Sequence, residues 1–231
     1  MSNPESFLEI QIGEGLGLVA LVKRAFARAN NEGSEIDPQL LKLHGMSGRL
    51  YRHFINNLIR ECESPHYLEV GSWSGSTLCA AISNNAVRAT AIDNWSQFGG
   101  PKTEFELNVA RFRTPQVYTN FIESDFRAVD YKLIGPFDIY LFDGPHEYQD
   151  QYDGLALALP ALADQFVFIV DDWNFEDVRS GTKKAIADIG LEVEYSIEIR
   201  SSLDGTHPTI AHENSDWHNG YFISVLRKSR S

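Results

Sequence analysis

Tyr67-Leu68-Glu69-Val70-Gly71-Ser72-Trp73-Ser74-Gly75-Ser76-Thr77-Leu78 is the stretch around which this chain is organised. It reads as a buried strand, a tight turn at Gly71 and the first turn of a helix that Ser76 or Thr77 can cap. Such a unit places free backbone N–H groups and a helix N-terminus beside the carboxyl edge of a sheet, where open α/β folds bind ligands. We therefore expect a ligand-binding loop here.

The spacing of the glycines argues against a dinucleotide as the ligand. A dinucleotide loop has three glycines as G-x-G-x-x-G, so that the pyrophosphate lies against bare backbone. Here Gly75 follows Gly71 by four residues, the third glycine is missing, and Trp73 would crowd a pyrophosphate. The acid that precedes the loop, Glu69, suggests a cationic ligand instead. The alternative is an ordinary strand–turn–helix of some other α/β protein.

The loop resembles the first motif of the class I S-adenosylmethionine-dependent methyltransferases. In that family the loop holds the amino-acid end of the cofactor, which carries an ammonium group and a sulfonium. The resemblance covers roughly residues 44–227. It implies a Rossmann-like α/β fold with a seven-stranded, mostly parallel sheet, helices on both faces and the strand order 3-2-1-4-5-7-6. It also implies S-adenosyl-L-methionine as the cofactor.

The composition narrows the class of protein. At 231 residues the chain is one domain, or one domain with an N-terminal extension. A net charge of −12 argues against a nucleic-acid or membrane-surface partner, because phosphates would be repelled. Cys62 and Cys79 read as small core residues. Without a signal peptide or an apolar run of ~18 residues, we expect a cytoplasmic enzyme with a small-molecule acceptor, as a monomer or homo-oligomer.

From residue 66 the pattern alternates between strands and helices, which implies a mostly parallel sheet. The expected strands are 66–71, 87–93, 117–123, 137–142, 166–170, 191–199 and 221–226. The expected helices are 75–84, 102–112, 148–159 and 176–189. This part, 66–231, is predicted to be the cofactor-binding domain and one structural unit.

Residues 1–65 are predicted to form an N-terminal helical extension or cap. Residues 1–14 look poorly organised, one helix begins at Leu16 and ends at 30–33, and a second runs from about Ser47 to Cys62. The joint at 44–49 is either a lid loop or a simple turn. A second long polar segment, 200–219, is typical of a functional or disordered loop. It contains His207, His212 and His218.

Asp93 is the first candidate for binding the nucleoside. It ends a strand 22 residues after Gly71, where an acid can accept hydrogen bonds from both ribose hydroxyls. Asn94 and Trp95 follow it, and an aromatic ring at this point could stack on adenine.

Asp125 and Phe126 are the candidates for binding adenine. The resemblance implies that a residue at the position of Asp125 bonds the adenine amino group, while an apolar neighbour such as Phe126 packs on the ring. The alternative for Asp125 is an N-cap of the next short helix. The whole predicted cofactor set is Glu69, Gly71, Trp73, Gly75, Ser76, Thr77, Asp93, Asn94, Asp125, Phe126 and Asp143.

Two acidic segments follow two buried strands. Asp143 follows the strand at 137–142, and Asp171 and Asp172 follow the strand at 166–170. Because adjacent parallel strands end at one edge, three carboxylates converge beside the loop. Like charges this close repel, and unpaired burial costs several kcal/mol each. Hard oxygen ligands favour Mg²⁺, with Mn²⁺ or Ca²⁺ as alternatives.

This arrangement is similar to that of the metal-dependent O-methyltransferases, such as catechol O-methyltransferase and the macrocin-type sugar enzymes. The resemblance implies Asp143, Asp171 and Asp172 as ligands of Mg²⁺ and His146 as the base that takes the acceptor's proton. His146 stands where the catechol enzyme has lysine, and an acid replaces an amide, which favours the sugar-modifying branch. Asn174 and His218 are further candidates.

The sequence therefore predicts a metal-assisted O-methyltransferase that acts on a hydroxyl of a small molecule or sugar. Three alternatives stay open at this point. The first is a metal-independent methyltransferase in which the acids only line a polar pocket, so that Asp143 makes a turn and Asp172 caps a helix. The second is a nicotinamide-dependent oxidoreductase. The third is a non-catalytic protein that binds S-adenosylmethionine.

Overall fold

The structure is a computed structural model that describes residues 7–11 and 17–229. Its strands are β1 (Phe7–Gln11), β2 (His66–Val70), β3 (Val87–Asp93), β4 (Val117–Glu123), β5 (Phe137–Phe142), β6 (Leu162–Val170), β7 (Glu192–Arg200) and β8 (Tyr221–Arg227). Its α-helices are α1 (Leu18–Asn31), α2 (Arg49–Glu61), α3 (Ser76–Ile82), α4 (Lys102–Phe112), α5 (Tyr148–Ala158) and α6 (Glu176–Ile189). Within these residues, no helix is long and apolar enough to cross a bilayer.

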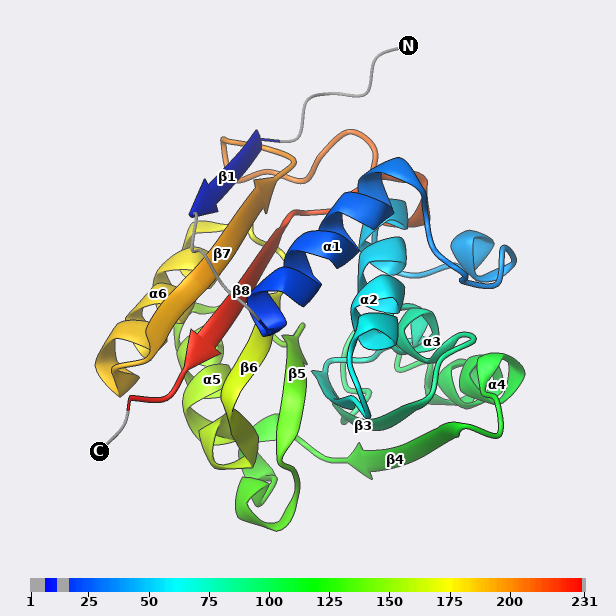
Figure 1. Ribbon diagram of the computed structural model, residues 1–231, viewed down its shortest axis with the longest axis horizontal. Coiled ribbons are helices and arrows are strands. Elements are labelled where there is room, and N and C mark those ends of the chain that lie inside the picture. The colour runs from blue at the N-terminus through cyan, green and yellow to red at the C-terminus, as the bar shows by residue number, and fades with distance from the viewer. Residues whose placement is uncertain (1–6, 12–16, 230–231) are drawn as a thin grey trace.

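The strands form one sheet in the order β1-β7-β8-β6-β5-β2-β3-β4. The five strands β2 to β6 run parallel to one another, and β8 is antiparallel to β6 and β7. The predicted fold class and the predicted order of seven strands are therefore confirmed. Figure 1 shows β8 inserted between β6 and β7, which places the last strand of the chain inside the sheet.

An eighth strand extends the sheet beyond the predicted seven. β1 pairs with β7 in antiparallel register, with Phe7 opposite Arg200. The expectation that residues 1–14 are poorly organised is wrong for 7–11, because the free edge of β7 offers unpaired backbone groups to an added strand. The remaining residues of 1–14, and the expected helix start at Leu16, lie outside the described residues.

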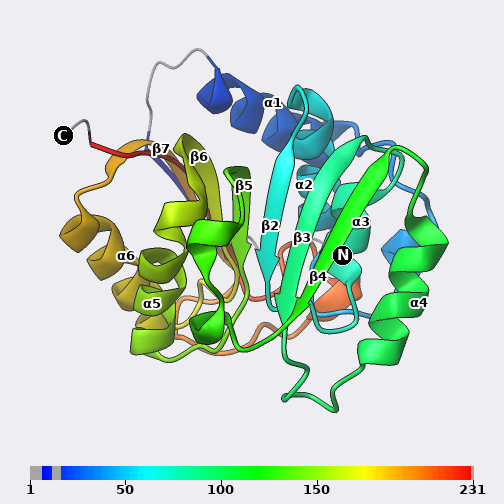
Figure 2. The same cartoon turned by 90° about the horizontal axis from the view of Figure 1, so that it is seen from below.

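Helices cover both faces of the sheet. Figures 1 and 2 show α1, α2 and α3 on one face and α5 and α6 on the other. Side chains of the central strands alternate between the two cores: Ile139 and Leu141 pack with α1–α4, whereas Tyr140 and Phe142 pack with α5 and α6. This explains why these strands read as continuous apolar runs in the sequence.

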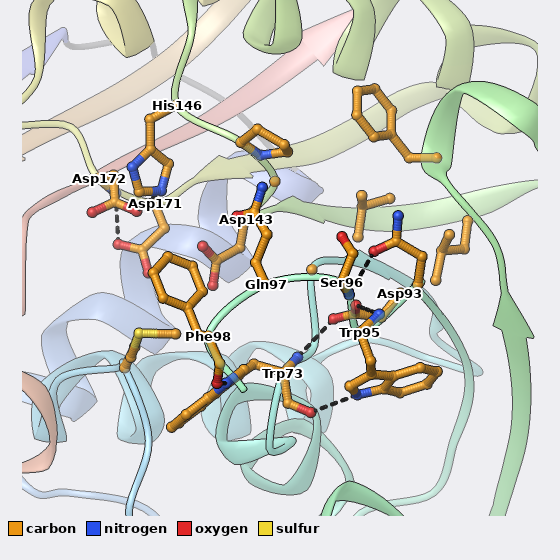
Figure 3. A pocket seen from close by; sticks show the side chains of 18 of the residues that line it. Trp73, Asp93, Trp95, Ser96, Gln97, Phe98, Asp143, His146, Asp171 and Asp172 are labelled. Atoms are coloured by element: carbon orange, nitrogen blue, oxygen red, sulfur yellow. Dashed lines mark hydrogen bonds and ion pairs between the residues drawn. The ribbon is translucent and has the colours of Figure 1, made fainter. Parts of the chain in front are cut away.

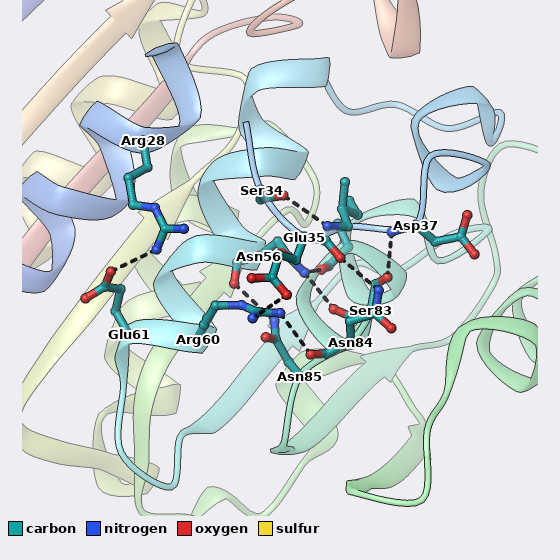
Figure 4. Close-up of polar contacts among 12 residues, drawn as sticks. Arg28, Ser34, Glu35, Asp37, Asn56, Arg60, Glu61, Ser83, Asn84 and Asn85 are labelled. Atoms are coloured by element: carbon teal, nitrogen blue, oxygen red, sulfur yellow. Dashed lines mark hydrogen bonds and ion pairs between the residues drawn. The ribbon is translucent and has the colours of Figure 1, made fainter. Parts of the chain in front are cut away.

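The helices of the predicted N-terminal extension belong to the first of these layers. α2 is buried along most of its length. Its Asn56 donates to the carbonyl oxygens of Ala80 and Ser83, at 2.9 and 2.8 Å, and so satisfies groups that the end of α3 leaves free. Arg28 on α1 pairs with Glu61 at 3.2 Å (Figure 4). The boundary at residue 65 stays a prediction.

Candidate active site at the carboxyl edge of the sheet

A cavity of about 470 Å³ opens at the carboxyl ends of the parallel strands. Its wall comes from the residues that follow β2, β3, β4, β5 and β6, and from the segment 207–219. This volume lies in the range of small-molecule sites, and the edge of an open sheet is where such sites occur. One cavity thus joins the predicted cofactor loop to the predicted acid cluster (Figure 3).

The turn at Gly71 brings the loop against the end of β5. Gly71 has φ = +85°, and a Cβ built on it would lie 1.8 Å from the carbonyl oxygen of Asp143. Any side chain here would collide with backbone, so the close approach requires glycine. Gly75 opens α3 at φ = +86°, where a Cβ would lie 2.9 Å from the ring of Phe105. The two glycines predicted from the sequence therefore shape the loop.

The predicted cofactor residues divide into two groups. Those that line the cavity are Gly71, Trp73, Asp93, Asn94, Asp125, Phe126 and Asp143. The other four, Glu69, Gly75, Ser76 and Thr77, are not among its lining residues. Glu69 lies buried behind the loop, where it accepts a hydrogen bond from the Tyr67 hydroxyl at 2.6 Å. Burial raises the pKa of Glu69 to about 7. The roles of all these residues stay predictions.

Asp93 clamps the loop from within the cavity. Its Oδ2 accepts the backbone N–H groups of Ser72 and Trp73, each at 2.8 Å, and its Oδ1 accepts that of Trp95 at 2.6 Å (Figure 3). A carboxylate has about four acceptor positions, so three are filled. We infer that Asp93 has room for one ribose hydroxyl while this clamp is intact, rather than the two expected from the sequence.

Three aromatic residues near the clamp adopt left-handed backbone conformations. Trp73, Trp95 and Phe98 have φ of +45°, +48° and +48°, which costs on the order of 1–3 kcal/mol each. The indole of Trp95 donates to the carbonyl of Trp73, and that of Trp73 donates to the carbonyl of Phe98, at 2.9 and 3.0 Å. Phe98 was not predicted from the sequence, although Gly99 and Gly100 beside it are typical of a tight turn.

The residues that follow β4 add an aromatic wall to the cavity. Phe126 lines it, and the guanidinium of Arg127 lies 4.6 Å from the centre of its ring. Asp125 accepts the backbone N–H of Arg127 at 2.8 Å, which is the N-cap that sequence analysis left open as an alternative. One oxygen of Asp125 is thus occupied by the cap, and an adenine contact would fall to the other.

Asp143, His146 and Asp172 come together at the acid end. Each offers one ligand atom, and these atoms lie within 4.8 Å of one another. His146 Nε2 lies 2.8 Å from Asp172 Oδ2. Asp171 is directed elsewhere, since it accepts from the Tyr221 hydroxyl at 3.1 Å and from the backbone of Asp172 at 2.7 Å. Its role as a metal ligand stays a prediction.

The charges of this cluster are coupled. Burial raises the pKa of Asp143 and of Asp171 well above the usual range, and the neighbouring carboxylates add to the effect. Burial would also raise the pKa of Asp172, but the hydrogen bond and charge of His146 outweigh it, and this pKa is lowered. For His146, burial lowers the pKa, yet Asp172 outweighs burial and raises it to about 9. The structure therefore favours a protonated His146 at neutral pH, and the predicted base must first lose this proton.

The segment 207–219 forms the remaining wall. Asn219, which sequence analysis missed, donates to Asp172 Oδ1 at 2.6 Å. His207, His212 and His218 line the cavity, whereas Asn174 is buried and accepts the backbone N–H groups that follow β7. No sequence signal pointed to Asn219, because its partner lies 47 residues away.

The joint before α2 is fastened to the same wall. Arg49 pairs with Asp216 at 2.7 Å, and the backbone N–H of Gly45 donates to Glu213. A Cβ on Gly48 would lie 2.2 Å from the carbonyl oxygen of Asp216. The segment 44–49, which was expected to be a lid or a turn, therefore packs tightly against the wall formed by 207–219.

Comparison with protein families identifies the central part of the chain. Residues 68–173, just under half of the chain, match a family described as a methyltransferase domain. This match supports the predicted enzyme class, an S-adenosylmethionine-dependent methyltransferase. None of the curated proteins matches the chain.

Solved structures with the same fold include proteins described as methyltransferases. TrmN from Thermus thermophilus is 15% identical with a TM-score of 0.53, and the match covers 89% of this chain and 53% of TrmN. This chain thus spans about half the length of that protein. Cofactor-bound Rv0187 from MTB is 12% identical with a TM-score of 0.52, over 92% and 90% of the two chains. The O-methyltransferase TomG from Streptomyces achromogenes, in complex with SAM, is 14% identical with a TM-score of 0.50, over 94% and 92%. At sequence identities this low, the structural similarity shows a shared fold only.

Proposed function

We propose that this methyltransferase transfers the methyl group of S-adenosylmethionine to a hydroxyl oxygen of a small molecule or sugar, with the help of a divalent cation. The observation that carries the proposal is the cluster of Asp143, His146 and Asp172. It lies in the same cavity as the Gly71 loop. TomG, which shares the fold, is itself described as an O-methyltransferase.

The acid end fits a divalent cation. It offers two carboxylates, those of Asp143 and Asp172, within 4.8 Å of one another and of the His146 ring, and Asp172 is only 5% exposed. Mg²⁺ and Mn²⁺ prefer carboxylate ligands, and Mn²⁺ is the more convenient probe. When bound, the cation would act as a Lewis acid that lowers the pKa of the acceptor hydroxyl.

The loop end fits the cofactor. Gly71 lines the cavity with bare backbone, and Trp73 and Phe126 add aromatic walls. Asp93 keeps one acceptor position for the ribose. Asp143 lies between the two ends and could accept from the ammonium group of the cofactor. Because methyl transfer is an in-line displacement, the main contribution of these residues is to position and desolvate the reactants.

His146 is the residue proposed to take the acceptor's proton. Its ring is stacked on Phe175 with centroids 5.8 Å apart, and 42% of the side chain is exposed. Asp172 stabilises the protonated form of the His146 imidazole. His146 can therefore act as a base only after it has lost this proton. Asn219 donates to the other oxygen of Asp172 and so helps to hold this carboxylate beside His146.

The charges of the cavity favour a small molecule over a nucleic acid. Among its described lining residues, Arg127 is the one lysine or arginine, and it lies at the Phe126 end. The acceptor end carries Asp143, Asp171 and Asp172 instead, and these would repel a phosphate backbone.

The test separates metal binding from cofactor binding. We expect Asp143→Asn and Asp172→Asn to abolish Mn²⁺ binding to the protein in complex with S-adenosylhomocysteine. Electron paramagnetic resonance of Mn²⁺ measures this binding. Affinity for S-adenosylhomocysteine should change by less than tenfold, or ~1.4 kcal/mol. Asp164→Asn, an exposed acid near the start of β6, serves as the control and should bind both.

Two outcomes would count against the proposal. Parallel loss of Mn²⁺ and S-adenosylhomocysteine would mean that the acids serve the cofactor alone. Retention of Mn²⁺ by both variants would remove the cluster as a metal site and leave a metal-independent methyltransferase, whose turnover should survive a chelator.

A further inference from the structure

His218 lies in the wall of the cavity and is not part of the predicted metal cluster. Its backbone is left-handed at φ = +44°, a conformation in which histidine and asparagine are enriched. Its backbone N–H donates to Ser215 Oγ at 2.9 Å, and the ring of His212 packs beside its own, with centroids 5.1 Å apart. The side chain is therefore held in one orientation, with 6% of the residue exposed.

The hydrogen bonds of His218 fix which ring nitrogen carries the proton. The backbone N–H of His212 lies 3.0 Å from Nδ1 and can only donate, so Nδ1 must be the acceptor. A charged imidazole would present N–H at Nδ1 to another N–H, which the geometry forbids. The ring is therefore neutral, and its proton is on Nε2.

This Nε2–H has no acceptor among the described residues. The polar atom in contact with it is the amide nitrogen of Asn219 at 3.2 Å, which is itself a donor and donates a hydrogen bond to Asp172 Oδ1 at 2.6 Å. Turning the amide over would place its oxygen at that distance from the Asp172 carboxylate, two acceptors in contact, so the orientation stands. A buried donor without an acceptor costs about 1–3 kcal/mol, unless a ligand supplies the missing oxygen.

We propose that His218 is a specificity residue that donates its Nε2–H to an uncharged oxygen of the methyl acceptor, a hydroxyl or carbonyl other than the one that is methylated. This inference rests on the proposed O-methyl transfer at the neighbouring acids. The donor lies one hydrogen-bonded group away from Asp172, so an oxygen bound there sits beside the proposed reacting oxygen. An anionic oxygen is disfavoured because Asp143, Asp171 and Asp172 line the same end.

Two variants separate the donor from the structural role of the residue. In His218→Asn the side-chain oxygen can replace Nδ1 as acceptor for the His212 N–H, and asparagine tolerates the left-handed backbone, but the donor at the Nε2 position is lost. In His218→Gln the longer amide can present N–H near the position of Nε2. The pair therefore removes and restores the donor at one site.

The experiment measures the affinity of catechol, as a probe with two adjacent oxygens, for the full chain loaded with S-adenosylhomocysteine. Calorimetry is run with MgCl₂ and with EDTA. We expect His218→Asn to weaken catechol binding at least tenfold and His218→Gln to remain within threefold of the unmodified chain. Both variants should bind S-adenosylhomocysteine within twofold. Equal catechol affinity in His218→Asn, or a parallel loss of S-adenosylhomocysteine, would overturn the inference.

The measurements with MgCl₂ and with EDTA test the His218 donor separately from the proposed metal site. A tenfold effect of His218→Asn in EDTA supports the His218 donor whatever Mg²⁺ does. If Mg²⁺ leaves catechol affinity unchanged in every chain, the cation is contradicted and the donor is not. A ¹⁵N spectrum of the histidine side chains gives an independent reading: we expect the Nε2–H tautomer at His218, and the Nδ1–H tautomer would overturn the inference.

Discussion

Glu69 shows how a single residue can combine a structural role with a pH response. Its side chain is fully buried behind the Gly71 loop and bonded to the Tyr67 hydroxyl. Burial raises its pKa from 4.5 to about 7, so the folded protein keeps this proton up to a higher pH than the unfolded chain does. Between these two pKa values the folded state binds more protons, and its stability must fall as the pH rises.

We expect Glu69→Gln to remove this slope. Glutamine keeps an acceptor for Tyr67 but carries no charge, so the variant should match the unmodified chain at pH 5. At pH 8 it should be more stable by on the order of 1–3 kcal/mol. Urea unfolding at the two pH values measures the difference, with Glu192→Gln at the exposed start of β7 as control. A variant that is destabilised equally at both values would contradict the role assigned to burial.

The sequence located the acid cluster but not the partners that decide its geometry. Asp143 and Asp172 were found because carboxylates that follow buried strands must meet at one edge. Asn219 was not, because it reaches the site through a long loop whose path no local pattern fixes, and His218 was a further candidate without an assigned role. The clamp at Asp93 was missed for the same reason: backbone N–H groups leave no signal in a sequence.

At the scale of elements, the end of α3 depends on a side chain from α2. Asn56 is fully buried and donates to two carbonyl oxygens, those of Ala80 and Ser83. Helix ends leave carbonyl groups without partners, and buried groups of this kind must be satisfied. α3 starts at the ligand loop. The hydrogen bonds from Asn56 to the other end of α3 therefore also anchor this loop to the helical layer.

We expect Asn56→Ala to lower the free energy of unfolding by about 2–4 kcal/mol, because two buried carbonyl groups lose their donor. Asn30→Ala is the control, since Asn30 makes one exposed bond to the backbone of its own helix and should change stability by less than about 0.5 kcal/mol. Chemical denaturation measures both. Equal, small effects would show that water replaces Asn56 without cost.

Predictability also varied from element to element. The parallel strands were located within a few residues because they are continuous apolar runs between turn residues. β6 begins four residues earlier than expected, since Leu162 to Gln165 mix buried and exposed positions and do not form such a run. β1 was missed because five residues carry too little pattern, and its pairing with β7 is decided by an edge 180 or more residues away.

At the scale of the whole molecule, protons and a divalent cation compete for the same groups. The chain carries a net charge of −12, and burial together with the neighbouring carboxylates raises the pKa of Asp143 and Asp171 at the cavity. His146 supplies the nearest positive charge, with a pKa of about 9. A cation that binds Asp143 and Asp172 must displace protons from this cluster, and its affinity must therefore rise with pH.

We expect the affinity for Mn²⁺ to increase at least tenfold between pH 6 and pH 8, and the rise in Tm produced by 1 mM MnCl₂ to grow accordingly. Below its pKa of about 9 His146 is charged and repels the ion, so binding releases about one proton from the pair that it forms with Asp172. Calorimetry in two buffers with different ionisation enthalpies counts that proton.

Asp172→Asn is the matched variant for this measurement. It keeps the shape of the side chain but removes both the charge that binds the cation and the charge that stabilises the His146 proton. It should therefore show no rise in Tm at either pH. A rise in Tm that is equal at pH 6 and pH 8, or that survives in Asp172→Asn, would place the ion elsewhere on this acidic surface.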